Sequence, residues 1–333
     1  MQALKVAVIG LGWWGRVLVE QIGHSSRLAV VHAVDVDPAA EAFARERGLR
    51  FSTRLDDALG DSEVEAVVLC TPHTQHADQV EAVAAAGRHV FCEKPLALTR
   101  ADAQRALGAV ERAGVTLAVG HEKRFEPPIV EVLRLLRAGE LGTPLQVEAN
   151  FSQDKFLALA TDNWRLSGRE APAGPMTATG IHLLDLSVAV FGAAERVLAS
   201  VRQLGSPLTN GDTLAVMASF RRGGHALISA MLATPFAGRF AVYGSEGWAE
   251  VRDKAHPESP EGWTLTVSRR GGGVQTTDYP PAPAALLNLE AFADAAQGVA
   301  PYAVPAEQML ANISALEAVF RSARDGDVAL VED

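Results

Sequence analysis

The sequence predicts an α/β protein of two domains, a doubly wound parallel sheet followed by a mainly antiparallel sheet with helices. The chain has 333 residues, a length that corresponds to about two domains. Up to residue 122, short apolar runs alternate with helix-length segments, as in doubly wound folds. Beyond that point the strand-like runs come closer together, which is typical of antiparallel strands joined by turns. We therefore expect domains at residues 1–122 and 123–333.

The predicted strands of the first domain are continuous apolar runs, typical of parallel strands buried on both faces. Helix-length segments separate them, and Thr99 with Asp102 resembles a capping box for the last helix. The expected strands are Leu4–Ile9, Leu28–Asp35, Ala66–Thr71, His89–Cys92 and Thr116–Gly120, and the expected helices are Gly15–Ile22, Pro38–Arg47, Gln75–Ala86 and Arg100–Ala113.

Near the start of the second domain, residues 126–128 form a proline-containing break, and a helix is predicted over 129–137. Residues 221–224, Arg-Arg-Gly-Gly, predict a hairpin turn between two of its strands. Two helical patterns close the chain, at 285–297 and 306–324, after a Pro-rich linker at 280–283. The expected strands are Leu145–Asn150, Arg196–Gln203, Thr213–Phe220, His225–Leu232, Arg239–Tyr243 and Thr264–Ser268.

Composition excludes several classes of protein. A 48% hydrophobic and 21% charged chain is ordinary for a globular protein. The net charge of −10, with no run of Lys or Arg, argues against nucleic acid or anionic membrane as partners. Two cysteines, Cys70 and Cys92, are too few for a thiolate zinc site and favour a reducing compartment. The N-terminus leads directly into a strand pattern, so we expect no signal peptide, no membrane span and a cytoplasmic protein.

The strongest local motif is Gly10-Leu11-Gly12-Trp13-Trp14-Gly15, between the first predicted strand and helix. Its glycines suit a tight turn, close backbone approach to a pyrophosphate, and close packing of helix on strand. The second predicted strand ends at Asp35, where a carboxylate can accept hydrogen bonds from an adenosine ribose and repel a 2′-phosphate. No Lys or Arg follows it closely. The pattern predicts binding of NAD rather than NADP. Asp37, which precedes Pro38, is expected to cap a helix.

Two further stretches end predicted strands of the same sheet, where ligands of such folds bind. The first runs from Thr71 to His76 (TPHTQH), and the second ends in Glu93-Lys94-Pro95. Lys94 is a candidate site residue because of this position. No His, Cys and Asp spacing indicates a metal site, and no Gly-x-Ser-x-Gly elbow indicates a hydrolase.

Taken in order, GLGWWG, Asp35, CTPHTQH, GRHVFCEKP and GIHLLD resemble the Gfo/Idh/MocA family of oxidoreductases. The resemblance covers nearly the whole chain. It implies a Rossmann domain followed by an α/β domain with a large open, mainly antiparallel sheet. It also implies NAD(P)-dependent hydride transfer at a hydroxyl-bearing carbon of a sugar, polyol or related small molecule, in a homodimer or homotetramer joined through the open sheet.

The resemblance also assigns roles to residues. Lys94 matches a lysine that contacts the substrate hydroxyl and the nicotinamide ribose, and His182 matches the acid/base histidine. Imidazole suits proton exchange near pH 7. The residues matched to the cofactor site, besides the glycine motif, are Thr71, Pro72, His76, Glu93, Trp164 and Arg165.

The chain departs from the family pattern at Ala178, where many members carry an Asp four residues before the histidine. A carboxylate is therefore missing from that position, and Thr177 or Thr179 could only donate a hydrogen bond. Asp185 falls on the same helical face as His182, so it is expected to orient the imidazole or bind substrate, or else to sit in the first turn of a helix. Arg124 is a further candidate for binding substrate.

Three alternatives remain at this point. The chain could use NAD in a transient oxidation that serves glycoside cleavage or elimination, act on cis-dihydrodiols, or sense a dinucleotide without catalysis. Net formation of NADH separates the first of these from a dehydrogenase.

Overall fold

The computed structural model describes residues 2–332, which divide into two compact units. The first unit combines residues 1–121 with residues 285–309, and the second combines residues 122–284 with residues 310–333. Residues 285–309 lie within the stretch expected to form the second domain, yet they pack with the first unit. The fold class is the predicted one, with one parallel and one mainly antiparallel sheet.

The first unit contains a six-stranded parallel sheet of order β3-β2-β1-β4-β5-β6. Its central strands are buried almost completely, which explains their continuous Val, Ile and Ala runs. The strand order reverses between β1 and β4, so the segments after these two strands flank the position where doubly wound sheets bind ligands. The strands are β1 (Leu4–Ile9), β2 (Leu28–Val34), β3 (Arg50–Ser52), β4 (Ala66–Leu69), β5 (His89–Cys92) and β6 (Leu117–Val119).

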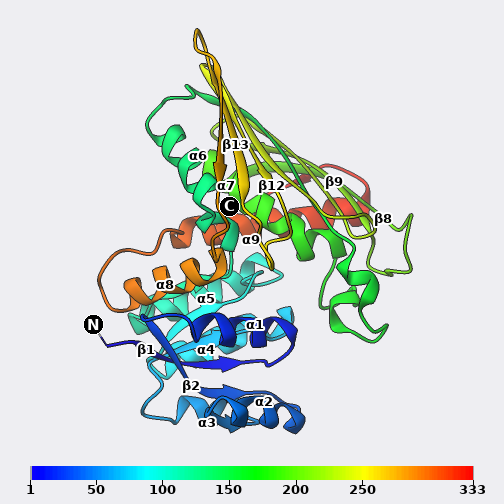
Figure 1. The fold of residues 1–333 in the computed structure, drawn as a ribbon. Helices are drawn as coiled ribbons and strands as arrows, with labels where there is room; N and C mark the ends of the chain where they lie inside the picture. The colour runs from blue at the N-terminus through cyan, green and yellow to red at the C-terminus, as the bar shows by residue number, and fades with distance from the viewer. Residues whose placement is uncertain (1, 333) are drawn as a thin grey trace. The chain divides into compact units, whose positions relative to one another are not determined.

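Helices flank this sheet, drawn in blue and cyan in Figure 1. Helix α5 has the predicted bounds because Thr99 caps it: the Thr99 hydroxyl accepts a hydrogen bond from the backbone N–H of Asp102. The helices are α1 (Trp13–Ile22), α2 (Glu41–Glu46), α3 (Leu55–Leu59), α4 (His76–Ala85) and α5 (Arg100–Ala113), with short 3-10 turns η1 (Pro38–Ala40) and η2 (His73–Gln75).

Helix α8 (Ala284–Ala296) returns to the first unit late in the chain and is drawn in orange in Figure 1. Its residue Phe292 packs edge-on against Phe91 of β5, with ring centroids 5.8 Å apart. The Asn288 amide donates a hydrogen bond of 2.9 Å to the carbonyl of Val119, and Tyr302 donates one of 3.0 Å to the same oxygen. These contacts fix the end of β6 and explain why residues 285–309 belong to this unit.

The second unit contains a nine-stranded sheet of order β14-β13-β12-β11-β7-β10-β9-β8-β15. All its neighbouring strands are antiparallel except β7 and β10. The predicted hairpin turn at 221–224 joins β9 to β10. The strands are β7 (Pro144–Ser152), β8 (Ala194–Arg202), β9 (Thr213–Phe220), β10 (His225–Met231), β11 (Ala237–Gly244), β12 (Gly247–Asp253), β13 (Trp263–Arg269), β14 (Val274–Tyr279) and β15 (Ala329–Leu330).

Helices cover one face of this large sheet. Helix α7 contacts β7 and β10, and α6 contacts β12 and β13. Side chains along β9 alternate accordingly: Leu214 and Val216 are buried, whereas Met217 is exposed on the other face. The helices and turns of this unit are η3 (Glu122–Phe125), α6 (Pro127–Arg137), η4 (Lys155–Ala158), η5 (Trp164–Leu166), the π-helical turn η6 (Met176–Gly180) and α7 (Ile181–Phe191); α9 (Ala306–Asp325) follows α8 and runs into this unit.

Among the described residues, no helix is both long and apolar enough to cross a membrane.

Candidate active site

The glycine motif forms a cradle between β1 and α1, and each glycine has its own steric reason. Gly10 has a φ of +92°, and a Cβ on it would lie 2.7 Å from the Cys70 carbonyl oxygen. A Cβ on Gly15 would lie 1.8 Å from the Gly10 carbonyl oxygen, so the helix could not approach the strand. A Cβ on Gly12 would meet no atom within 4 Å. Gly12 therefore leaves open space for a ligand at the start of the helix.

The start of α1 suits an anionic group. The first turn of the helix has no acidic residue, and no side chain caps Gly12. The first backbone N–H groups of a helix, with the positive end of its dipole, bind phosphate well. Trp13 is half-exposed and its ring centroid lies 5.4 Å from that of Trp14. The cradle fits the pyrophosphate of a dinucleotide.

Asp35 holds the glycine-rich loop in place. One carboxylate oxygen accepts a 2.6 Å hydrogen bond from the backbone N–H of Leu11, and the other accepts one of 2.9 Å from that of Asp37. The sequence motif indicated a ribose contact but not this bond to the loop. Asp37 is the predicted helix cap, because its side chain accepts from the N–H of Ala39.

His76 joins the turn after β4 to the loop after β5. Its Nδ1 lies 2.6 Å from the carbonyl oxygen of Pro95, and its Nε2 lies 2.9 Å from that of Thr71. The ring is fully buried. Thr71 in turn donates its hydroxyl proton to Gln79 at 2.5 Å. His76 was expected to line the cofactor site, and its contacts fix the two predicted site loops to each other.

Glu93 and Lys94 follow β5 directly. Glu93 is buried, and a Cβ on Gly120 would lie 2.6 Å from its carboxylate, so a side chain there would displace that carboxylate. The Glu93 carboxylate accepts a 3.2 Å hydrogen bond from the backbone N–H of Lys94. Lys94 is half-buried and its peptide bond to Pro95 is cis. Burial raises the pKa of the neighbouring Cys92 thiol well above its usual value, so this thiol is not a nucleophile at neutral pH.

In the second unit, His182 lies near the start of α7, directly after the π-helical turn η6. Its side chain is buried, and its ring centroid lies 6.1 Å from that of Phe151 on β7. Both threonines considered as partners for the imidazole donate to backbone carbonyls: Thr179 to Phe151 at 2.8 Å, and Thr177 to Gly174 at 3.2 Å.

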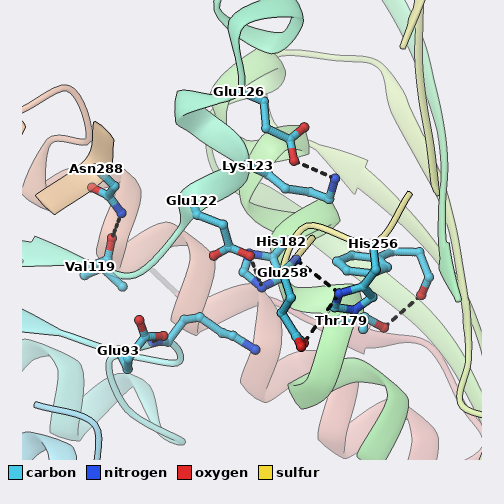
Figure 2. A network of polar contacts seen from close by, with 12 residues as sticks. Glu93, Val119, Glu122, Lys123, Glu126, Thr179, His182, His256, Glu258 and Asn288 are labelled. Atoms are coloured by element: carbon cyan, nitrogen blue, oxygen red, sulfur yellow. Dashed lines mark hydrogen bonds and ion pairs between the residues drawn. The ribbon is translucent and has the colours of Figure 1, made fainter. Parts of the chain in front are cut away.

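A carboxylate nevertheless reaches the imidazole from another segment. Glu122, the first residue of η3, places Oε1 3.5 Å from His182 Nε2, and Figure 2 shows this contact as a dashed line. The sequence analysis identified the missing Asp at position 178 and assigned no role to Glu122. The two residues are 60 positions apart, so no local pattern could link them.

Arg124 and Asp185, both predicted to bind substrate, are bonded to each other. Arg124 Nε lies 2.5 Å from one carboxylate oxygen of Asp185, and a second guanidinium nitrogen lies 2.9 Å from the other. Both side chains are buried. The bidentate pair ties η3 to α7, and Asn312 of α9 adds a 3.4 Å contact to Asp185. In the structure Asp185 therefore forms an ion pair with Arg124, and its expected role toward His182 or the substrate stays a prediction.

Lys123 belongs to a separate buried cluster. Its ammonium lies 3.0 Å from Glu126 and 2.9 Å from Asp253, and 5.0 Å from the centre of the Phe151 ring. Burial raises the pKa of Glu126 to about 8, although Lys123 opposes this. Burial would lower the pKa of Lys123, but Asp253 and Glu126 outweigh it and hold that pKa above its ordinary value. Lys123 is therefore a charged structural residue.

His256, which no sequence pattern indicated as a site residue, also packs against Phe151, with ring centroids 5.9 Å apart. Its Nε2 lies 2.8 Å from the Gln153 side-chain oxygen, and its Nδ1 lies 3.1 Å from Lys155 Nζ. Burial, together with the Lys155 and Lys123 charges, lowers the pKa of His256 to about 4. His256 is therefore neutral at physiological pH.

Trp164 and Arg165 lie in the loop predicted over 161–175. The Arg165 guanidinium carbon lies 4.2 Å from the centre of the Trp164 ring. The Asn210 amide anchors this loop by donating 2.9 Å hydrogen bonds to the carbonyls of Arg165 and Ala171. Asn210 is a positioning residue that the sequence did not reveal.

Within residues 2–332, no group of three or more His, Cys, Asp or Glu side chains is arranged to hold a metal ion.

The cradle, the parallel sheet and the second sheet define a dinucleotide-binding oxidoreductase. Residues 4–121 match the model of the oxidoreductase family with an NAD-binding Rossmann fold, and residues 129–250 match the Gfo/Idh/MocA C-terminal domain. The chain belongs to the Gfo/Idh/MocA family of NAD(P)-binding oxidoreductases.

Three similar proteins illustrate this relationship. A 1,5-anhydro-D-fructose reductase from Ensifer adhaerens is 28% identical over 87% of each chain. GenD2 from gentamicin A biosynthesis, solved in complex with NAD, is 27% identical with a TM-score of 0.85 over 100% of this chain and 97% of that one. An oxidoreductase from Desulfitobacterium hafniense, whose description names NADPH, shares the fold with a TM-score of 0.89 at 23% identity, over 99% of this chain and 98% of that one.

Proposed function

We propose that this protein is an NAD-dependent dehydrogenase or reductase that acts on a hydroxyl-bearing carbon of a sugar, polyol or related small molecule. The observation that carries the proposal is the dinucleotide cradle of Gly10, Gly12 and Gly15 in a chain of this family. The substrate class is supported by relatives whose names state sugar substrates, such as the 1,5-anhydro-D-fructose reductase.

Lys94 and His182 are proposed to handle the substrate hydroxyl. A nicotinamide, when bound, supplies the acceptor or donor of the hydride. The Lys94 ammonium binds the hydroxyl oxygen and stabilises the charge that develops there as the proton leaves. His182 takes that proton in oxidation and returns it in reduction. Glu93 positions Lys94 through its contact with the Lys94 backbone N–H.

The cofactor residues are proposed on the same basis. Phosphates would bind the backbone N–H groups at the start of α1, and Thr71, Pro72 and His76 would line the cofactor, as would Trp164 and Arg165. Asp35 would accept hydrogen bonds from the adenosine ribose through its remaining lone pairs, because each oxygen already accepts from one backbone N–H. This role favours NAD over NADP.

The exposed face of the large sheet supports a proposal on the oligomeric state, and the two cysteines support one on the cellular compartment. Leu198, Met217 and Leu227 are 41–46% exposed on the face of the large sheet opposite α7. Such an apolar patch favours association, so we expect a homodimer or homotetramer through this face. No disulfide joins Cys70 and Cys92, in keeping with a protein of the reducing cytoplasm.

The experiment that tests the function is a panel of sugars, polyols and cis-dihydrodiols incubated with NAD or NADP and read at the NADH absorbance band. One NADH per product molecule supports the dehydrogenase. Product without accumulated NADH would instead indicate transient oxidation, and dinucleotide binding with no turnover across the panel would indicate a sensor. Lys5→Ala is a suitable control variant, because Lys5 lies in the same unit but pairs with Glu63 at the surface.

A further inference from the structure

We propose that Glu122 is the positioning residue of His182 and replaces the carboxylate that position 178 lacks. This inference rests on the proposed role of His182 as the acid/base group. Glu122 Oε1 and His182 Nε2 are 3.5 Å apart, and the two side chains are only 12% and 3% exposed. At this distance and burial, the carboxylate stabilises the imidazolium form of His182 more than the neutral form.

The other charges around His182 are already balanced within this unit. From α7, Asp185 forms a bidentate pair with Arg124. From β7, the neutral ring of Phe151 faces His182. Lys123, whose ammonium lies 5.0 Å from the centre of that ring, is paired with Asp253. Thr179 of η6 donates to backbone carbonyls. Glu122 is a carboxylate of this unit that lies within ion-pair distance of the imidazole.

The fold holds Glu122 in place through its neighbours in η3. Arg124, two residues later, is bonded to Asp185, which lies three residues after His182 on α7. One buried ion pair therefore fixes the two segments that carry Glu122 and His182. This explains how two residues distant in sequence come together in the fold.

The contact also assigns different roles to the two ring nitrogens of His182. Because Nε2 faces Glu122, an N–H at Nε2 is favoured, and Nδ1 is the nitrogen that takes the proton from the substrate hydroxyl. The resulting imidazolium carries N–H groups at both positions, with Glu122 paired to the one at Nε2. The O–H bond of the substrate breaks, the N–H bond at Nδ1 forms, and the carboxylate remains ionised.

The test compares the full-length protein with Glu122→Gln, which keeps the shape of the side chain and removes its charge. NMR titration of imidazole resonances, with His182 assigned from a His182→Gln variant, reports protonation without any substrate. The midpoint for His182 should fall by about one pH unit in Glu122→Gln. Ala178→Asp in the Glu122→Gln background places a carboxylate four residues before His182 and should raise the midpoint again. Glu246→Gln, which removes an exposed carboxylate of the same unit, should leave it unchanged.

Enzyme activity provides a second, independent test of the role of Glu122 once the substrate panel identifies a substrate. The acidic limb of the profile of kcat/KM against pH should move down with the NMR midpoint in Glu122→Gln, while NAD affinity stays the same. An unchanged His182 midpoint in well-folded Glu122→Gln protein would overturn the assignment of Glu122. A shifted midpoint with no change in the rate profile would instead remove His182 from the proposed reaction and leave the contact as an ion pair without a catalytic effect.

Discussion

At the scale of single residues, the glycines of the cradle have a steric reason for their positions, and the buried charges have an electrostatic one. Gly10 and Gly15 are required by contacts of 2.7 and 1.8 Å that any Cβ would make, and the spacing of the motif predicted both. Asp185 and Arg124 were predicted as site residues, but the sequence could not show that their charges would be satisfied by each other. Pairing between distant residues depends on the tertiary structure, so neither this pair nor Glu122 with His182 was predictable.

Asp35 yields the first residue-scale prediction. Its carboxylate should exclude the 2′-phosphate of NADP, so NAD should bind more tightly to the unaltered protein. Asp35→Ala should narrow the difference in affinity between NAD and NADP. It should also weaken the binding of both cofactors, because the Leu11 N–H loses its acceptor. Fluorescence titration with both dinucleotides measures the two effects. Tighter binding of NADP than NAD by the unaltered protein would contradict the proposed preference.

At the scale of elements, most strands and helices were predicted, whereas β3, α3, β12 and β14 were not. Helix α5 and strand β9 have the predicted bounds. Strand β3 has three residues and α3 has five, too few to show a period. Strand β14 is an edge strand whose residues are almost all exposed, so it lacks the apolar alternation that identifies a strand. The π-helical turn η6 has no sequence signature that we could use.

The loop before β9 gives an element-scale prediction. Asp212 is buried, and burial alone would raise its pKa, but hydrogen bonds from Leu204 N, Ser206 Oγ and Gly205 N lower it to about 2. A depressed carboxylate pKa stabilises the fold above the ordinary value of 3.8, and this contribution is lost as pH falls toward 2. The shift corresponds to about 2 kcal/mol.

Asp212→Asn should therefore lower the free energy of unfolding by about 2 kcal/mol at neutral pH. The difference from the unaltered protein should shrink as the pH falls from about 4 toward 2, because Asp212 takes up a proton first in the unfolded chain and then in the folded protein. Urea unfolding at a series of pH values measures this. A difference that stays constant with pH would show that the loop owes its stability to packing and not to the ionised carboxylate.

At the scale of the whole molecule, the sequence predicted two sheets of different kinds and the class of enzyme, and both agree with the structure and the family. It did not predict that residues 285–309 pack with the first unit. Helix α8 was correctly expected as a helix, but its partners, such as Phe91 and the carbonyl of Val119, lie far away in sequence. A helical pattern in the sequence indicates which face of the helix is apolar, but it does not indicate which segment packs against that face.

The open face of the large sheet supports a prediction about assembly. Met217 and Leu227 are exposed between buried neighbours on β9 and β10, so burying them in a dimer or tetramer would remove apolar surface from water. Light scattering at micromolar concentration should give a mass of two or four chains, and Met217→Lys should shift the population toward monomers. A monomer mass for the unaltered protein would count decisively against this interface.

The central claim is that Lys94 and His182 handle the substrate proton while a hydride moves to or from nicotinamide. Single-turnover hydride transfer, followed by NADH absorbance with the substrate that the panel identifies, tests it most directly. Lys94→Ala should slow the step by about 100-fold or more, since such electrostatic contributions are worth roughly 3–4 kcal/mol. His182→Ala should slow it by about 100-fold with unchanged NAD affinity, as expected for a lost general base. Lys5→Ala should react at the normal rate. Near-normal hydride transfer in the Lys94 and His182 variants would contradict the proposed mechanism.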